Sequence, residues 1–394
     1  MSSRRILNAT DESTYSIDSE TKSDARIAAT YLNATELSLL SGHAILSRSL
    51  SVKSIISTAS SFARRFQQAS NNPDLQQLVQ IGQGLQGAIF EQAGRSLIFK
   101  KENPGNSELP TNLRHEHKLH TSVLAAFQEF GVSVQCNVLV PRVYNIIGPE
   151  SKVWDSDNQK FKFPEAYQSR TTLVEMERIL PLPKVIRKAL ITHFYPQQKH
   201  EALSSNIVDK ILNLTANKHC LARIYLGKRL GAFTKEKFSL RNFPLYLAPM
   251  ENLELDIHSL ADSMGSAFAI MHWGAGVNGD DVEFVFGTAA KSDPTSENFQ
   301  KRRIGFYLLD FGQCDSVDLS DEVASVYQSF KGALVTGDNQ LFIPHYKNSP
   351  ALFASFKRGY IRAAEFILRE KGLEGRFCAA DFMLEYEEYA EDFL

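Results

Sequence analysis

Three glycines and a lysine form the first group of residues that could do chemistry. The pattern Gly-x-Gly-x-x-Gly occurs at Gly82, Gly84 and Gly87, and Lys100 ends a short apolar run soon after it. Because glycine has no Cβ, the main-chain N–H groups of such a turn can approach a polyphosphate closely. A lysine ammonium beside the turn would bind the α- and β-phosphates. The spacing predicts a strand, a phosphate-covering turn and two further strands, the last ending at Lys100.

A carboxylate partner is expected for this lysine, because a nearby opposite charge keeps an ammonium ionised in a cleft. Glu116 lies in the middle of a helix that we predict from Asn112 to Phe130. We therefore predict that Glu116 pairs with Lys100. Lys101 and Glu102 are the competing residues for these two roles, since they follow Lys100 directly in the sequence.

A third feature is the apolar strand that carries Met176. Leu173 to Ile179 reads as a strand, and the two prolines at positions 181 and 183 stop it. The segment from Met176 to Arg178 resembles a hinge, where main-chain groups would bind the edge of an adenine. An ordinary strand end is the alternative, because recognition by the main chain leaves little trace in a sequence.

The tripeptide Asp310-Phe311-Gly312 directly follows the apolar strand Phe306 to Leu309. A carboxylate in this position could hold a Mg²⁺ ion that bridges phosphate groups. The tripeptide comes downstream of the glycine-rich turn and its lysine, in the order that a phosphotransferase site requires. Asp310 is therefore the predicted metal ligand.

A base for the hydroxyl group that accepts the phosphate should come from the loop that leads into the strand before that of Asp310. Two ways of counting along this loop place the base at different residues. Counting forward from His272 puts Asp280 at the base position. Counting back from the next apolar strand makes Glu283 a second metal ligand and puts Asn278 at the base position. Asp281 is a third candidate, as its carboxylate could enter the same space. Because an amide cannot accept a proton, we predict Asp281 or Asp280 as the catalytic residue.

Composition excludes several classes of protein. The chain has 394 residues and a formal net charge of -2, which argues against a general nucleic-acid binder. It has no apolar run of the roughly 20 residues needed to span a bilayer, and its first residues lack the apolar core of a secretory signal. Its four cysteines show no C-x-x-C pairing. We expect a protein of the cytoplasm or nucleus that is not secreted.

The order of predicted elements favours an α+β class with a bilobal, protein-kinase-like fold. Strands and one helix come first, then a connector, then a mainly helical half that contains one strand pair, Val282 to Phe286 and Ile304 to Leu309. A doubly wound sheet would require strands and helices to alternate throughout. Residues 260–273 predict a strong helix in the second half, with one broad apolar face.

Three regions follow from this order. Residues 1–74 are predicted to form an N-terminal extension that is disordered over about the first thirty residues and then partly helical. Residues 75–180 would form a small β-rich N-lobe with one helix. Residues 181–394 would form the larger, mainly helical C-lobe, which holds the catalytic-loop and Asp-Phe-Gly segments.

Three segments resemble the fungal domain-of-unknown-function 3669 family, which is similar to protein kinases and small-molecule phosphotransferases. They are Met271 to Ala275, Asp281 to Gly287 and Leu308 to Phe311. The family pattern D-x-x-D-V-E-F-V-L-G has an aspartate where this chain has Asn278, and it matches Asp281 and Glu283. The resemblance implies a kinase-like fold and a nucleotide site, and no established activity.

Two functions are consistent with these residues. The first is an ATP- and Mg²⁺-dependent phosphotransferase acting on a small-molecule or protein hydroxyl; a small molecule is favoured because no A-P-E anchor follows Asp310. The second is a catalytically inactive pseudokinase, a scaffold that transfers nothing. A third possibility places the function in the N-terminal arm, Glu36 to Gln68, with an inert fold behind it.

Overall fold

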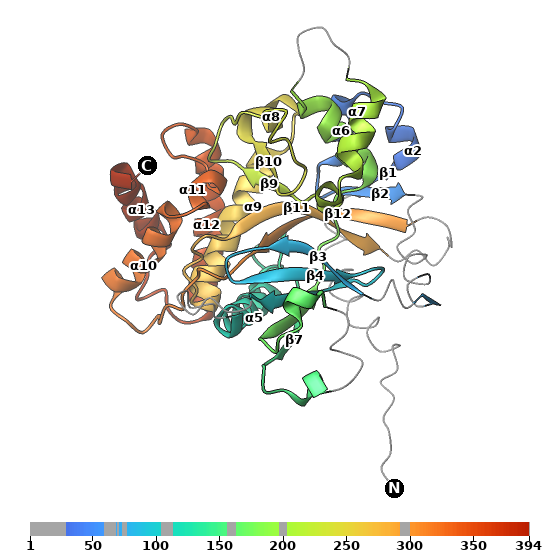
Figure 1. Cartoon of the computed structure of the whole chain (residues 1–394). Coiled ribbons are helices and arrows are strands. Elements are labelled where there is room, and N and C mark those ends of the chain that lie inside the picture. The colour runs from blue at the N-terminus through green and yellow to red at the C-terminus, as the bar shows by residue number, and fades with distance from the viewer. Residues whose placement is uncertain are drawn as a thin grey trace.

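The computed structural model describes residues 29–393 except 59–67, 69–70, 73–76, 104–112, 156–162, 197–202 and 292–299. The described residues form a mixed α/β fold with two β-sheets and helices packed against them (Figure 1). The predicted disorder of the first residues falls on positions 1–28, which lie outside the described residues. Each sheet has its own cluster of buried apolar side chains.

The smaller sheet has five strands in the order β3-β4-β5-β8-β7, all antiparallel. Its strands are β3 (Leu78–Gln83), β4 (Gly87–Gln92), β5 (Leu97–Glu102), β7 (Val143–Ile147) and β8 (Leu173–Glu177). Helix α5 (Leu113–Phe130) lies beside it and matches the predicted helix. The sheet's other side buries Phe90, Trp154 and Tyr167 with short 3-10 turns, η2 (Lys152–Asp155) and η4 (Glu165–Tyr167). The predicted run of strands with one helix is confirmed.

The larger sheet has seven strands, with β12 pairing β11 on one side and both β2 and β6 on the other. Its strands are β1 (Thr30–Asn33), β2 (Ser54–Thr58), β6 (Val138–Leu139), β9 (Ala222–Tyr225), β10 (Phe243–Tyr246), β11 (Glu283–Lys291) and β12 (Gln300–Leu309). In Figure 1 the β3–β4 hairpin lies next to β11 and β12. The two sheets therefore face each other across the region that holds the predicted site.

The prediction of a single strand pair in the second half was wrong, as was the expectation of helix alone before the glycine-rich turn. Four further strands, β1, β2, β9 and β10, join the larger sheet. They are only four or five residues long. In β2 both Ile55 and Ile56 are buried, so the apolar–polar alternation of a half-exposed strand is missing. A strand of four or five residues is too short to give a clear periodic signal.

Ten further helices surround the larger sheet in the described part of the chain. They are α2 (Ala34–Leu37), α3 (Gly42–Ser49), α6 (Lys184–Phe194), α7 (Ser205–Asn213), α8 (Leu247–Asn252), α9 (Ile257–Ala269), α10 (Val323–Val335), α11 (Asn339–Phe342), α12 (Pro350–Glu370) and α13 (Ala379–Phe393). The turn η5 (Thr215–His219) precedes β9. Within the described ranges, no helix is long and apolar enough to cross a membrane.

Helices α9 and α12 pack closely because glycines face each other's backbone. A Cβ at Gly265 would lie 2.0 Å from the Phe356 carbonyl oxygen, and one at Gly359 would lie 2.0 Å from that of Asp262. The end of α9 continues as a π-helical turn, η6 (Ile270–Ala275). This rigid helix pair fixes the point from which the chain enters the loop before β11.

Candidate functional site

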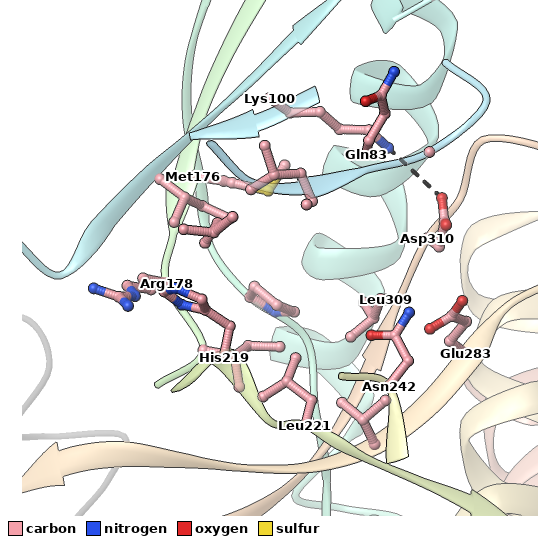
Figure 2. A pocket seen from close by; sticks show the side chains of 18 of the residues that line it. Gln83, Lys100, Met176, Arg178, His219, Leu221, Asn242, Glu283, Leu309 and Asp310 are labelled. Atoms are coloured by element: carbon pink, nitrogen blue, oxygen red, sulfur yellow. Dashed lines mark ion pairs between the residues drawn. The ribbon is translucent and has the colours of Figure 1, made fainter. Parts of the chain in front are cut away.

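A cavity of about 270 Å³ is lined by residues of both sheets, α5 and the segment after β8 (Figure 2). Every residue predicted to bind nucleotide or metal lines it. These residues are Gly82, Gly84, Gly87, Lys100, Glu116, Met176, Glu283 and Asp310. Among the described residues that line the cavity, the predicted catalytic residues Asp280 and Asp281 do not occur. The fold thus gathers the predicted binding residues around the cavity, and the base candidates are not part of its lining.

Lys100 lies between two carboxylates on the cavity wall. Its Nζ is 2.5 Å from Oε1 of Glu116 on α5. It is also 3.6 Å from Oδ1 of Asp310, the ion pair drawn as a dashed line in Figure 2. Lys100 and Glu116 are almost completely buried, with 9% and 4% of their surfaces exposed. Burial alone would lower the pKa of Lys100, but the charges of Glu116 and Asp310 raise it above its ordinary value. The predicted ion pair is present, and the ammonium stays charged.

Lys101 points away from this pair, because side chains alternate across a strand. Its Nζ lies 4.4 Å from the ring centre of Trp154 and donates a hydrogen bond to Oγ1 of Thr171. Burial lowers the pKa of Lys101 to about 8. The Glu102 carboxylate accepts a backbone hydrogen bond and is not part of the cavity lining among the residues described. Of the competing residues, the geometry selects Lys100.

The glycine-rich turn is held in place from both sides. A Cβ at Gly87 would lie 2.5 Å from the carbonyl oxygen of Lys101, so only glycine fits there. The Asn103 amide donates hydrogen bonds to two carbonyl groups of the turn. At the tip, the Gln86 side chain donates a hydrogen bond to the carbonyl group of Gly312. The turn therefore lies over the cavity and contacts the segment that carries Asp310.

Asp310 sits in a left-handed backbone conformation, with φ of 67°. The next side chain, Phe311, is fully buried and packs against the His120 ring, with 4.8 Å between ring centres. Burial lowers the pKa of His120 to about 4, and its Nε2 donates to the Pro141 carbonyl group at 2.8 Å. The buried phenylalanine anchors the chain, so that the half-exposed carboxylate of Asp310 faces the cavity.

Glu283 reaches the same place through strand register. It lies opposite Leu309 in the β11–β12 pairing, one residue before Asp310. Figure 2 shows Asp310 between Lys100 and Glu283. Burial raises the pKa of Glu283 to about 7 despite its ion pair with Arg223, and the nearby charge of Asp310 contributes. The Arg223 guanidinium also lies 3.6 Å from the carboxylate of Asp338.

Asn278 organises the loop through its side chain. Its Oδ1 accepts hydrogen bonds from the N–H groups of Asp280 at 3.2 Å and Asp315 at 2.9 Å. Its carbonyl oxygen accepts from Nε2 of His272 at 3.0 Å. His272 is fully buried, and burial lowers its pKa to about 3. The imidazole is thus neutral, and Tyr360 donates its hydroxyl proton to Nδ1. The amide takes a structural role where the family pattern has an aspartate.

The two candidate bases have partners within the protein. The Asp280 carboxylate accepts a hydrogen bond from the Thr336 hydroxyl at 2.8 Å. The Asp281 carboxylate accepts from the Asp338 N–H at 2.9 Å and from the Gln313 amide. Burial raises the pKa of Asp281, and the neighbouring carboxylates of Asp338, Asp310 and Asp280 add to the shift. Asp281 is therefore the candidate whose charge interacts with that of Asp310.

After Met176 the main chain runs along the cavity through Glu177 and Arg178 to Pro181. The N–H groups of Glu177 and Arg178 donate to carbonyl groups of neighbouring segments. The N–H of Ile179, which also lines the cavity, makes no such bond to another described residue. The segment thus lines the cavity, and the hinge interpretation stays a prediction.

Sequence reasoning missed three residues of the site: Arg223, Gln86 and Asp338. Arg223 belongs to β9, a four-residue strand that was not predicted, and pairs with a glutamate 60 positions away. Asp338 follows Gly337 in a loop before α11 and has no motif around it. Gln86 was visible as the tip of the glycine-rich turn, which is the only signal that pointed to any of the three.

The carboxylates suit a divalent cation that is completed by a ligand. Within the described ranges, no group of three or more His, Cys, Asp or Glu side chains could hold a metal ion by itself. Magnesium ions are usually bound by one or two carboxylates together with substrate phosphates and water. Asp310, half exposed and next to Lys100, fits that arrangement. Glu283 fits less well, because Arg223 already pairs with it.

In comparisons with known proteins, no family model and no curated sequence matches the chain. The resemblance to the fungal family stays a prediction.

Proposed function

We propose that this chain is a kinase-like phosphotransferase that binds ATP with Mg²⁺ in the cavity and transfers phosphate to the hydroxyl group of a small molecule. One observation carries the proposal: Lys100 is held between Glu116 and Asp310 beneath a glycine-rich turn. A buried ammonium needs a carboxylate to stay charged. The second carboxylate, half exposed, is then free to take part in metal binding.

The fold supports the same proposal. The five-stranded sheet with α5 would be the N-lobe, and the seven-stranded sheet with its helices the C-lobe of a bilobal fold. The segment from Glu177 to Ile179 would then connect the lobes and bind the adenine edge through its main chain. Fold alone does not define an activity, so the roles below rest on the residues of the site.

Bound Mg²⁺ would neutralise the phosphate charge that develops during transfer. Asp310 would supply one metal ligand, and the Lys100 ammonium would orient the α- and β-phosphates. The N–H groups around Gly84 would cover the phosphates from above, since no Cβ obstructs them. These groups position and neutralise, which is most of what phosphoryl transfer requires from a protein.

Asp281 is the residue that we assign to the acceptor hydroxyl, ahead of Asp280. Burial and the neighbouring carboxylates raise its pKa, which makes it a stronger base than an ordinary aspartate. The Gln313 amide and the Asp338 N–H fix its orientation. To reach an acceptor, the Asp281 side chain would release Gln313 and turn toward Asp310.

A small-molecule acceptor is favoured over a protein. A protein kinase has an activation segment that ends in an A-P-E anchor. Here the chain passes from Asp310 through Asp318 and Glu322 directly into α10, which begins at Val323, and it contains no such anchor. The segment is too short to form a docking platform for a peptide.

A pseudokinase is the second candidate, and two observations favour it. Arg223 occupies the Glu283 carboxylate, and Asn278 stands where the family pattern has an aspartate. A protein of this kind would bind nucleotide in the same cavity without transferring phosphate.

Thermal unfolding with ATP and MgCl₂ tests the binding step. A ligand at 100 times its Kd stabilises the folded state by about 2.7 kcal/mol. We expect such a shift for the wild type and its loss for Asp310→Asn, with Asp392→Asn on α13 as the matched control. No shift at millimolar nucleotide contradicts the proposal. A shift without ATP consumption over a panel of hydroxyl-bearing metabolites identifies the pseudokinase.

A further inference from the structure

Arg223 holds a central position among the acidic residues of the site. Its guanidinium forms an ion pair with Glu283 and lies 3.6 Å from the Asp338 carboxylate. The side chain is 19% exposed and belongs to the cavity lining. Its Nε is buried and donates to no atom of the described residues, so one of its donors is unused. Arginine stays protonated at every pH that proteins encounter.

Glu283 stands where a protein kinase would hold its second metal ion, so its ion pair with Arg223 bears on metal binding. In protein kinases one metal ion is held by the aspartate after the strand and a second by the residue that ends the catalytic loop. Asp310 and Glu283 stand at these two places, brought side by side by the β11–β12 register. A cation next to Glu283 is therefore expected at any such site. The cation that the fold supplies is the guanidinium of Arg223.

We propose that Arg223 takes the place of the second metal ion, so that the nucleotide site holds one divalent cation, at Asp310. The inference rests on the proposed nucleotide function and goes beyond it by fixing the number of metal ions. A second divalent cation at Glu283 would lie against a permanent positive charge, which disfavours it strongly in a half-buried site. Arg223 lines the cavity, so its terminal N–H groups, rather than the buried Nε, would donate to the phosphate that the second metal would otherwise contact.

Counting bound metal tests the inference without measuring activity. The probe is Mn²⁺, titrated into full-length protein that is in excess over the non-hydrolysable ATP analogue adenylyl imidodiphosphate. Electron paramagnetic resonance of free Mn²⁺ then gives the number of ions bound per nucleotide. We expect one ion for the wild type and two for Arg223→Gln, because the substitution frees the Glu283 carboxylate.

Three control variants sharpen the count. Arg223→Lys keeps a cation beside Glu283 and should bind one ion. The double variant with Arg223→Gln and Glu283→Gln removes the second ligand, and it should return to one. Arg229→Gln removes an exposed arginine from its pair with Glu251 outside the site, and it should behave as the wild type. Circular dichroism confirms that each variant is folded.

Two ions in the wild type would overturn the inference, as would one ion in a folded Arg223→Gln variant that binds the analogue. Absence of nucleotide-dependent Mn²⁺ binding in every variant would overturn the proposed function together with the inference. The two failures are distinguishable. A wrong ion count can be observed only when nucleotide is bound, whereas failure of the proposed function means that no nucleotide-dependent binding is seen. Should Arg223→Gln fail to fold, the wild-type count keeps the test valid, because two ions there overturn the inference by themselves.

Discussion

The two sides of the cavity use their charged residues differently. On the side of the five-stranded sheet, Lys100 pairs with Glu116 and also lies close to Asp310, which belongs to the opposite side. On the side of the loop before β11, the carboxylates of Asp281 and Glu283 are occupied by partners from their own side. On the first side, a buried ammonium therefore lies between a buried and a half-exposed carboxylate. On the second side, the carboxylates are already paired with groups of that same side.

Under the proposed function, this difference would separate nucleotide binding from phosphate transfer. To bind a phosphate, the Lys100 ammonium needs only to be charged and to line the cavity, and it meets both conditions, with the half-exposed Asp310 beside it as the proposed metal ligand. A base must reach a hydroxyl, and Asp281 must first exchange its hydrogen bond from Gln313 for one to the acceptor. Substitutions on the two sides should therefore have separable effects.

The largest effect is expected for Lys100→Met. It leaves the Glu116 carboxylate buried without its partner, which costs about 3–5 kcal/mol in the free energy of unfolding. Nucleotide-induced stabilisation should disappear as well. Urea unfolding, with and without ATP and Mg²⁺, measures both. Lys235→Met, at an exposed position, is the control. A Lys100→Met protein that is as stable as the wild type would show that the pair contributes nothing to folding.

Acid should destabilise both sides through buried neutral imidazoles. The pKa of His272 is lowered to about 3 and that of His120 to about 4, so below pH ~6.5 the unfolded state binds protons that the folded state does not. Stability is complete above that pH and is lost as pH falls toward the folded values. Each residue should account for about 2 kcal/mol between pH 6.5 and 5.

Urea unfolding at pH 7 and pH 5 checks this, using His272→Phe for the loop side and His120→Phe for the other. Each variant should be less stable at pH 7, because buried polar partners lose their bonds, yet should change less between the two pH values. His43→Gln, at an exposed position, should change as the wild type does. If only one of the two variants reduces the change in stability between pH 7 and pH 5, acid destabilises only the side that carries that histidine.

A smaller effect is expected from Lys101, the neighbour that points away from the cavity. Its folded pKa of about 8 is below that of an unfolded lysine, so the unfolded state binds more protons above pH 8. Stability should therefore rise with pH, by about 1 kcal/mol between pH 8 and 9. Lys101→Met should remove the rise and keep nucleotide binding. Loss of nucleotide binding would mean that the two adjacent lysines share one role.

The smallest effect should come from Gln86→Ala, which removes the contact between the glycine-rich turn and Gly312. A single hydrogen bond contributes about 0.5–1.5 kcal/mol net. Hydrogen exchange at the amides from Gly82 to Gly87 should accelerate about threefold to fivefold. Leu85→Ala, exposed in the same turn, is the control. Unchanged exchange would mean that Asn103 alone holds the turn.

The sequence predicted the residues that belong to short local patterns. Lys100, Glu116 and Asp310 each follow or occupy an element with a clear period, and each lies where a known motif expects it. Helix α5 and the β11–β12 pair were also predictable, since both are long and strongly apolar on one face or strand. In these cases local propensity and tertiary structure agree.

What the sequence left open depends on contacts between distant segments. Arg223 meets Glu283 because the short strand β9 pairs with β11, and the four residues of β9 have no period to reveal them. The choice between Asp280 and Asp281 was likewise open, because hydrogen bonds from Thr336, Gln313 and the Asp338 N–H decide it. Pairings over such separations are set by the whole fold.

Strands β1 and β2 have a consequence for where the chain can be divided. Residues 55–58 of β2 pair with residues 300–303 of β12, and Ile55 and Ile56 are buried in that sheet. A shortened protein that starts at the glycine-rich turn would expose this edge of β12, with unpaired backbone groups ready to join another chain. Such a fragment should self-associate at its open edge, whereas one that keeps residues from 29 onward should stay monodisperse.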